Sequence, residues 1–375
     1  MMANSPEIVA PVTSEPNPQG PASATGNRRW LWVLGLMVLA FLLPMVISDF
    51  RVFQVTLALV YAIALLGLNM LTGYNGQISL GHGAFYALGA YTAAIMMDHF
   101  GMPYYVTLVP AGLLCLAVGF LFGLPALRLE GLELAVATLA LAVAAPQFLK
   151  YDAFEEWTGG VQGIILDKPE VPFGLSINQD QWLYYFTLIV TFIMFVAAWN
   201  LLRGRTGRAI VAVRDHHISA ETMGVNTALY KSLTFGVSAF YTGVAGALGA
   251  IVIQFVAPDS FQLFLSITFL VGIVVGGLAS ISGAIYGGLF ILFVPNIAQD
   301  ISAAAPWAIY GIFLLAFMYI MPTGVAGFVR IFGAWLARAR QDPAAAIAAI
   351  GPRIRQSISQ RWGGVLSLLQ RKRTG

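Results

Sequence analysis

Long apolar runs, separated by short polar segments, recur along the sequence and constrain its fold more than any other feature. A helix crosses a bilayer with about 20 apolar residues, and about ten runs approach that length. Only 10% of the residues are charged and 58% are hydrophobic, against roughly 25% and 45–50% in soluble domains. We therefore predict an all-α polytopic membrane protein with about ten transmembrane helices, in a range of about eight to ten. The expected spans are Trp30–Ile47, Phe53–Leu71, Ile78–Met97, Tyr104–Leu124, Leu132–Leu149, Trp182–Leu202, Ser232–Val256, Leu263–Gly277, Gly283–Ala298 and Ala305–Met321.

The two ends of the chain differ from this apolar middle. Residues 1–27 are rich in Pro, Ser, Ala and Asn, which predicts a disordered tail. Residues 28–327 form the expected transmembrane domain. In 328–375, apolar residues such as Phe328 and Phe332 alternate with arginines, which predicts a basic amphipathic tail, although 341–375 could equally be solvated. A cleaved signal peptide is the alternative for the first run, but no small-residue cleavage site follows it.

Basic residues are concentrated in alternate loops. The loop Lys150–Gln181 carries six acidic residues, and the segments on its side of the membrane hold only Arg51, Lys150 and Lys168 as basic residues. The loop 203–231 is strongly basic. Short loops rich in Lys and Arg stay in the cytoplasm, so we predict that 150–181 faces outward and that both termini are cytoplasmic.

The stretch Gly73–Thr92 contains five glycines and several polar side chains between two apolar runs. Backbone of this kind is tolerated at membrane depth only against protein or beside a water-filled cavity. We therefore predict a broken or re-entrant segment near 73–82 beside a translocation pathway. For His82, a packing role with satisfied hydrogen bonds is the alternative to a gate. The candidate pathway residues are Asn75, Gln77, Ser79 and His82.

Small residues recur at helical spacing in two of the spans. Such stripes allow helices to pack backbone against backbone in lipid. Packing within the chain and contact with a second membrane subunit are both open interpretations. The members are Gly83, Ala87, Ala90 and Ala94, then Ala239, Gly243, Gly246 and Ala250. A faint similarity between Gly76–Gly89 and Gly277–Gly288 is too short to establish a repeat.

The basic loop contains a stretch of helical character near 208–224. Thr206 can cap its start and Gly224 can end it. Ile210, Val213, Ala220 and Met223 fall on one stripe of the helical wheel, with Arg208, Asp215 and Ser219 on the other side. A short amphipathic helix on the membrane surface can dock into a groove of another protein or rest on lipid headgroups.

The sequence holds no recognisable catalytic or phosphate-binding motif. It lacks a Gly-x-x-x-x-Gly-Lys-Ser/Thr loop and a His-Glu-x-x-His metal motif. His216 and His217 are adjacent, so a helix would point them about 100° apart, which is poor geometry for a shared metal. We expect a non-catalytic protein that binds no cofactor and no metal. A secondary transporter and a channel or scaffold remain alternatives.

Two passages resemble a known family. The first is Leu71–Thr92, "LTGYNGQISLGHGAFYALGAYT", and the second is Gly207–Ala250 with its Gly-Arg-Ala, Ala-x-Arg and Tyr-Lys elements. Both resemble the inner-membrane permease subunits of branched-chain amino acid ABC importers, and the first is closer to the LivM-like subunit than to its LivH-like partner. The glycine-rich turn Gly276–Gly288 fits the same family.

The resemblance implies a permease of the bacterial inner membrane that works with several partners. These are a second related permease, two cytosolic ATPase subunits that use ATP and Mg²⁺, and a periplasmic binding protein. The helix near 208–224 would be the coupling helix in an ATPase groove, although Asp215-His216-His217-Ile218 departs from the commoner pattern. The residues carried over to that role are Arg208, Arg214, Asp215, Ala220, Glu221, Met223 and Gly224.

The expected cargo is a branched-chain or related hydrophobic amino acid delivered by the binding protein. Such a cargo suits a largely apolar path without a strong ligand-binding charge in the spans. Urea and short-chain amide importers use similar permeases and are the alternative.

Overall fold

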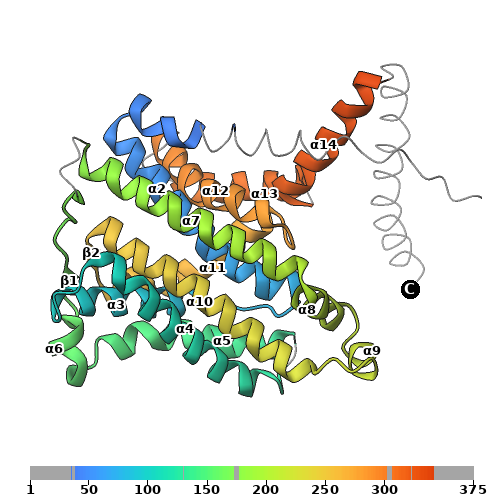
Figure 1. The fold of residues 1–375 in the computed structure, drawn as a ribbon, viewed down its shortest axis with the longest axis horizontal. Coiled ribbons are helices and arrows are strands. Elements are labelled where there is room, and N and C mark those ends of the chain that lie inside the picture. Colours follow the sequence, from blue (N-terminus) through green and yellow to red (C-terminus); the bar gives the residue numbers. More distant parts are fainter. Residues whose placement is uncertain are drawn as a thin grey trace, which may run out of the picture. The chain divides into compact units, whose positions relative to one another are not determined.

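The computed structural model describes residues 35, 39–129, 131–172, 177–301, 306–321 and 323–341. The chain divides into two compact units, Met1–Ile47 and Ser48–Gly375. In the first, residues 39–46 are helical. The second is a helical bundle with one short pair of strands (Figure 1). The expected disordered tail, 1–27, lies outside the described residues, as do 342–375.

The helices of the second unit follow one another with short connections. The strands β1 (Ile164–Ile165) and β2 (Phe255–Val256) pair antiparallel, with Ile164 opposite Val256. The α-helices are α2 (Asp49–Asn69), α3 (His82–Asp98), α4 (Tyr104–Ala126), α5 (Leu132–Leu149), α6 (Glu155–Thr158), α7 (Gln179–Arg203), α8 (Arg205–Asp215), α9 (His217–Thr222), α10 (Thr227–Ile253), α11 (Leu263–Gly276), α12 (Ile281–Ile301), α13 (Pro306–Ile320) and α14 (Gly324–Gln341).

Seven helices of the described residues are long and apolar enough to cross a membrane. Each expected run after the first coincides with one helix of the bundle, but α3 and α13 are only 17 and 15 residues long. The run Trp30–Ile47 lies partly outside the described residues. The all-α membrane fold is therefore confirmed, and the expected number of about ten spans is matched only loosely.

Some helix boundaries differ from the expected ones for local reasons. Helix α10 begins at Thr227 instead of Ser232, because the Asn226 side chain accepts a hydrogen bond from the Leu229 N–H at 2.9 Å and caps the helix. Helix α3 begins at His82 instead of Ile78, because the preceding residues are not helical. Helix α14 is continuous from Gly324 to Gln341 and so crosses the expected domain boundary at 328, which stays a prediction.

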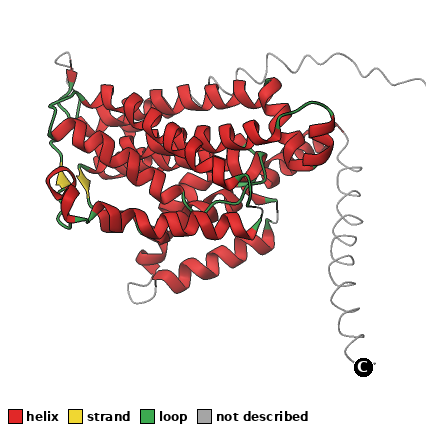
Figure 2. Cartoon of the chain, turned by 90° about the horizontal axis from the view of Figure 1, so that it is seen from below, coloured by secondary structure: helices red, strands yellow, loops and turns green. Residues whose placement is uncertain are grey.

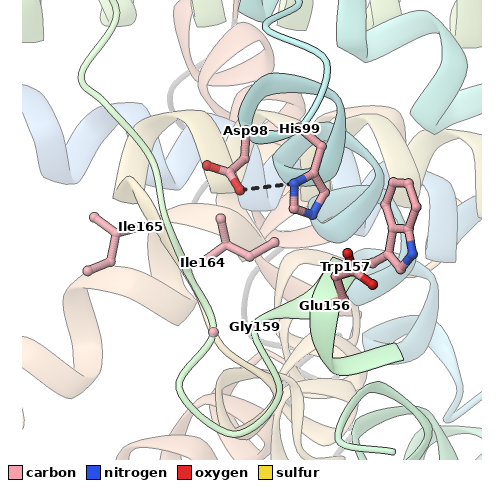
Figure 3. Close-up of a pocket in the computed structure, with 8 residues that line it drawn as sticks. Asp98, His99, Glu156, Trp157, Gly159, Ile164 and Ile165 are labelled. Atoms are coloured by element: carbon pink, nitrogen blue, oxygen red, sulfur yellow. Dashed lines mark ion pairs between the residues drawn. The ribbon is translucent and has the colours of Figure 1, made fainter. Parts of the chain in front are cut away.

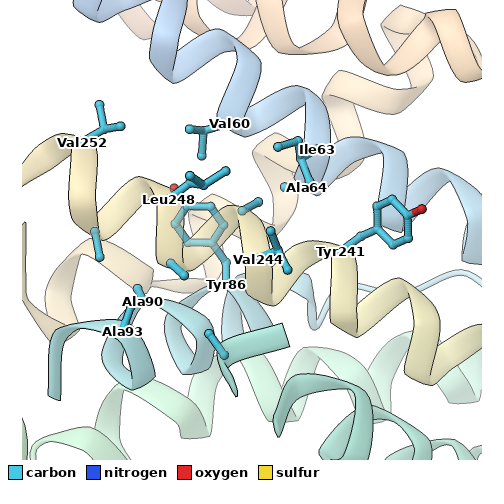
Figure 4. Close-up of a cluster of buried hydrophobic side chains, with 14 of the residues drawn as sticks. Val60, Ile63, Ala64, Tyr86, Ala90, Ala93, Tyr241, Val244, Leu248 and Val252 are labelled. Atoms are coloured by element: carbon cyan, nitrogen blue, oxygen red, sulfur yellow. The ribbon is translucent and has the colours of Figure 1, made fainter. Parts of the chain in front are cut away.

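Helices α2 and α10 lie at the centre of the bundle. In the apolar part of these two helices, 78% and 83% of the residues are buried. The corresponding shares in α7 and α5 are only 22% and 28%. Figure 4 shows Ile63 of α2, Tyr86 of α3 and Leu248 of α10 in the same buried cluster. The peripheral helices therefore leave apolar faces for lipid or for another subunit.

Glycine allows α3 and α10 to approach backbone to backbone. A Cβ on Gly246 would lie 2.0 Å from the Tyr86 carbonyl oxygen, and one on Gly89 would lie 2.1 Å from the Gly243 carbonyl oxygen. Distances this short cannot be accommodated without separating the helices. Ala90 of the first stripe and Gly243 and Gly246 of the second therefore lie in this contact together with Gly89, whereas Gly83 lies against Ser266 of α11 and Ala239 against Gly119 of α4.

The connections gather at two opposite ends of the bundle (Figures 1 and 2). At the β1–β2 end, Lys150 pairs with Asp259 at 2.6 Å, and the long 150–178 connection is held against β2. At the α8–α9 end lie the segment 75–81, the turn 277–280 and the start of α14. The acidic and basic loops identified in the sequence are therefore at opposite ends of the bundle.

Candidate functional site

The predicted break in the chain after α2 is present. Helix α2 ends in a π-helical turn, Met70–Tyr74, and residues 75–81 are irregular up to the start of α3. Gly76 has φ +77°, a conformation that side-chain-bearing residues rarely adopt. A π turn of this kind often occurs at functional sites, because it leaves backbone groups free to make other hydrogen bonds.

Hydroxyl side chains from two other helices satisfy the backbone of this segment. The Leu80 N–H donates to Thr138 Oγ1 of α5 at 2.9 Å. The Gly83 N–H donates to Ser266 Oγ of α11 at 2.8 Å. Both hydroxyl residues are fully buried. The non-helical backbone is therefore stabilised by protein groups, as its depth in an apolar bundle requires.

His82 is buried at the centre of the bundle. Its Nδ1 lies 3.0 Å from Ser79 Oγ, and its Nε2 lies 2.7 Å from Ser238 Oγ. Because the Ser238 hydroxyl donates to the Gly67 carbonyl at 2.6 Å, His82 Nε2 must donate to Ser238, which places a proton on Nε2. His82 and Ser79 thus connect α3 with α10 and α2, and they line neither of the two cavities described below.

Asn69 joins the break after α2 to a second break, between α11 and α12. Its Nδ2 donates to the Ser280 carbonyl at 2.8 Å, and its Oδ1 accepts from the Ala279 N–H at 2.9 Å. The Asn69 side chain is fully buried. The π turn at the end of α2 and the turn between α11 and α12 therefore meet at this residue, and a Cβ on Gly73 would lie 2.5 Å from the Ala279 nitrogen.

Arg214 of α8 contacts the first break from the other side. Its Nη1 donates to the Gly73 carbonyl at 2.9 Å, and its Nε and Nη2 lie 2.9 Å from Asp215 Oδ1. A Cβ on Gly76 would be 2.8 Å from Arg214 Cγ, so the chain at Gly76 passes directly over the arginine side chain. A movement of α8 would therefore act directly on residues 73–76.

A cavity of about 220 Å³ lies between the break, the start of α5 and α8. Asn75 and Gln77 line it, whereas Ser79 and His82 do not. Arg214, His217 and Lys231 bring basic or imidazole groups to its wall. Two of the four candidate pathway residues thus face a space that a small polar molecule could enter.

Comparison with known proteins identifies the family. Residues 51–322 match the family described as branched-chain amino acid transport system / permease component. The chain belongs to this family. It is 31% identical over 327 residues to the high-affinity branched-chain amino acid transport system permease protein LivM of Escherichia coli (strain K12), a match that covers 81% of this chain and 76% of that protein.

Other relatives in the comparison are also permeases. The chain is 27% identical over 302 residues to the permease protein LivH of Salmonella typhimurium, covering 73% of this chain and 93% of that protein. It is 27% identical over 307 residues to the galactofuranose transporter permease protein YtfT of Escherichia coli (strain K12). This match covers 73% of this chain and 82% of that protein. No solved structure matches the chain. This permease is therefore a multi-pass membrane protein and a transport subunit.

The segment that we expected to form one coupling helix contains two helices in the structure. Helix α8 ends at Asp215, His216 is extended (φ −155°, ψ 94°), and α9 begins at His217. Thr206 lies inside α8, which begins at Arg205, so the expected cap is wrong. Gly224 does lie just past the end of α9, after the C-cap residue Met223, with φ +83°.

Only part of the expected apolar stripe is buried. Ile210, Val213 and Ala220 pack against the bundle, but Met223 is 84% exposed, because the chain turns away after α9. Ile218 is also 67% exposed. Glu221 accepts a hydrogen bond from Thr227 Oγ1 at the start of α10. The exposed residues among the remaining candidates are Arg208, Arg214, Asp215 and Gly224.

A second cavity, of about 180 Å³, lies at the β1–β2 end (Figure 3). Asp98 and Glu156 bring carboxylates to it, and Trp157 forms part of its wall. His99 Nδ1 lies 3.5 Å from Asp98 Oδ2. The His99 ring meets the Trp157 ring edge-on, with the two ring centroids 5.0 Å apart. Among the described residues, no group of three or more His, Cys, Asp or Glu could hold a metal ion.

Sequence reasoning missed the residues that hold the break in place. Asn69, Thr138, Ser238 and Ser266 are polar residues inside apolar runs. A lone Ser or Thr in a membrane helix usually bonds back to its own helix, so the pattern alone does not mark it. The available signal was their place inside an expected span, because a polar group within a membrane-spanning helix needs a partner.

Proposed function

We propose that this permease is the translocation subunit of an ATP-driven importer of branched-chain amino acids in the bacterial inner membrane. Its family and the names of its relatives LivM and LivH support this function. The single observation that carries it is the match of 51–322 to the family, which spans the break, the cavity beside it and the α8–α9 element. Both termini and α8–α9 face the cytoplasm, in agreement with the basic charge of that end.

The proposed assembly contains three further kinds of protein. A second, LivH-like permease completes the pathway, since the chain is similar to relatives named LivM and LivH. Two cytosolic ATPase subunits bind ATP and Mg²⁺ and dock on α8–α9, and a periplasmic protein delivers the amino acid at the β1–β2 end. The chain itself is non-catalytic. The contacts of Arg214 with Gly73 support a mechanical role for α8, because they connect the docking element to the break.

Uptake by whole cells tests the proposed function. Deleting the gene should abolish high-affinity uptake of labelled leucine, and the full chain should restore it. Unlabelled isoleucine and valine should compete, whereas urea, acetamide and galactofuranose should not. Uptake that persists without ATP, or that only urea or an amide inhibits, would contradict the proposal.

Charged substitutions on the exposed apolar residues of α9 should uncouple the permease from its ATPases. Ile218→Asp and Met223→Asp change side chains that are 67% and 84% exposed, so the chain should still fold and insert. A buried interface anchor typically contributes about 2 kcal/mol or more, so a desolvated aspartate should weaken ATPase association about thirtyfold or more. Co-purification of the ATPases and leucine uptake should fall together.

Ile165→Asp is the matched control for these two variants. Ile165 is 79% exposed but lies on β1, at the opposite end of the bundle. It should leave co-purification of the ATPases unchanged. If Ile218→Asp and Met223→Asp behave like this control, α9 is not the docking element. Glu221 is a poorer test site because it also bonds Thr227 within the chain.

A further inference from the structure

We propose that the 220 Å³ cavity beside the break is a binding site for the zwitterionic head group of the transported amino acid, with Asn75 facing the ammonium group and Arg214 and Lys231 the carboxylate. The inference rests on the proposed function and adds to it the residues that contact the cargo. The cavity lies at the α8–α9 end, so it would hold the amino acid late in its passage.

Asn75 supplies the acceptor for an ammonium group. Its side chain is 4% exposed, and its Oδ1 has no hydrogen-bond partner among the described residues. The other half of the amide is fixed, because Nδ2 donates to Gln77 Oε1 at 3.0 Å. A buried acceptor without a partner costs about 1–3 kcal/mol, which a donor entering the cavity would recover.

Arg214 and Lys231 supply the positive charge for a carboxylate. The guanidinium has five N–H donors, and contacts with Asp215 and Gly73 occupy its Nε, Nη1 and Nη2 once each. Two N–H donors of Arg214 therefore remain for a ligand. Asp215 pairs with Arg214, but the two remaining N–H donors still belong to a charged guanidinium, which favours a carboxylate over a neutral acceptor.

The remaining wall suits an aliphatic side chain. Leu129, Leu134 and Val213 line the cavity together with Gly76 and Gly131. A water molecule occupies roughly 30 Å³ in the liquid, so the cavity has room for about seven of them, or for a small organic molecule. An aliphatic α-amino acid presents an ammonium, a carboxylate and an apolar side chain, and each has a matching part of the wall. Urea, amides and sugars lack the carboxylate.

Protection of an engineered cysteine from a maleimide tests the site. The native Cys115 is buried, so the full chain in membrane vesicles should label slowly before any cysteine is added. Leu129→Cys adds a thiol to the cavity wall without removing a proposed ligand group. At leucine concentrations tenfold above the dissociation constant, mass action leaves about a tenth of the sites empty, so labelling should slow about tenfold.

Ligand analogues show which groups of leucine are needed for protection, and a matched control shows whether protection is specific to the cavity. Leucinamide lacks the carboxylate and 4-methylpentanoate lacks the ammonium, so each should protect Leu129→Cys much less than leucine. Met223→Cys, which is exposed and outside the cavity, should label at the same rate with or without leucine. Absence of leucine protection at Leu129→Cys, or equal protection by leucinamide, overturns the proposal.

A variant of Asn75 separates recognition from simple blocking of the cavity. In the Leu129→Cys chain, Asn75→Leu should abolish protection by leucine, whereas Asn200→Leu, outside the cavity on α7, should leave it unchanged. Protection retained in Asn75→Leu would remove Asn75 from the site. The analogue series needs no such variant, so it decides the proposal even if Asn75→Leu fails to fold. Normal leucine uptake together with absent protection would reject this site but keep the proposed function.

Discussion

Replacing Gly246 with leucine should prevent this permease from reaching its folded state in the membrane. A Cβ at that position would lie 2.0 Å from the Tyr86 carbonyl oxygen and 3.0 Å from the Ala90 backbone nitrogen. Both neighbours are backbone atoms of α3, so no side-chain rotation can relieve the clash, and α3 and α10 must separate. Overpacking of this kind costs about 3 kcal/mol or more, a large fraction of a typical protein's stability.

The yield of monodisperse protein after detergent extraction and the midpoint of thermal unfolding measure this effect. Gly311→Ala in α13 is the matched control, because among the described residues nothing lies within 4 Å of a Cβ there. That change should be neutral or stabilising by up to about 1 kcal/mol, since alanine is the better helix former. Equal behaviour of the two variants would show that α3 and α10 are not in backbone contact.

The stripe that contains Gly246 illustrates what the sequence could and could not predict. Spacing in the sequence identified small residues on one face of each helix, and the structure places part of each stripe, at Ala90 and at Gly243 and Gly246, in contact. Spacing cannot tell which helix a stripe will meet, so contact with a second subunit remained an alternative to packing within the chain. Gly89, which completes the contact, does not fall on the predicted stripe of α3.

The α8–α9 element shows a second limit. The periodicity of Ile210, Val213 and Ala220 predicted their burial, and all three are buried, although Ala220 lies on α9 and the other two on α8. Met223 continues that periodicity in the sequence but is exposed, because α9 ends at Thr222 and the chain changes direction. Periodicity therefore fails where a helix ends, and that end depends on contacts with the rest of the bundle.

Asn69 was missed entirely, and its replacement carries the other large expected effect. Asn69→Leu keeps the size of the side chain but removes the partners of the Ala279 N–H and the Ser280 carbonyl. Leaving one buried N–H without a partner costs about 1–3 kcal/mol. The variant should lower the midpoint of thermal unfolding and should also reduce leucine uptake in proportion to the displacement of the break.

A second substitution shows whether Asn69 acts by holding the turn between α11 and α12. Ala279 has φ +54°, which costs a residue with a side chain roughly 1–2 kcal/mol and costs glycine almost nothing. If Asn69 compensates for that strain, Ala279→Gly should stabilise the Asn69→Leu chain more than it stabilises the unmodified chain. The difference between these two gains is the coupling free energy of the pair. Equal gains in both backgrounds would mean that Asn69 contributes only its hydrogen bonds, and that the turn keeps its shape without them.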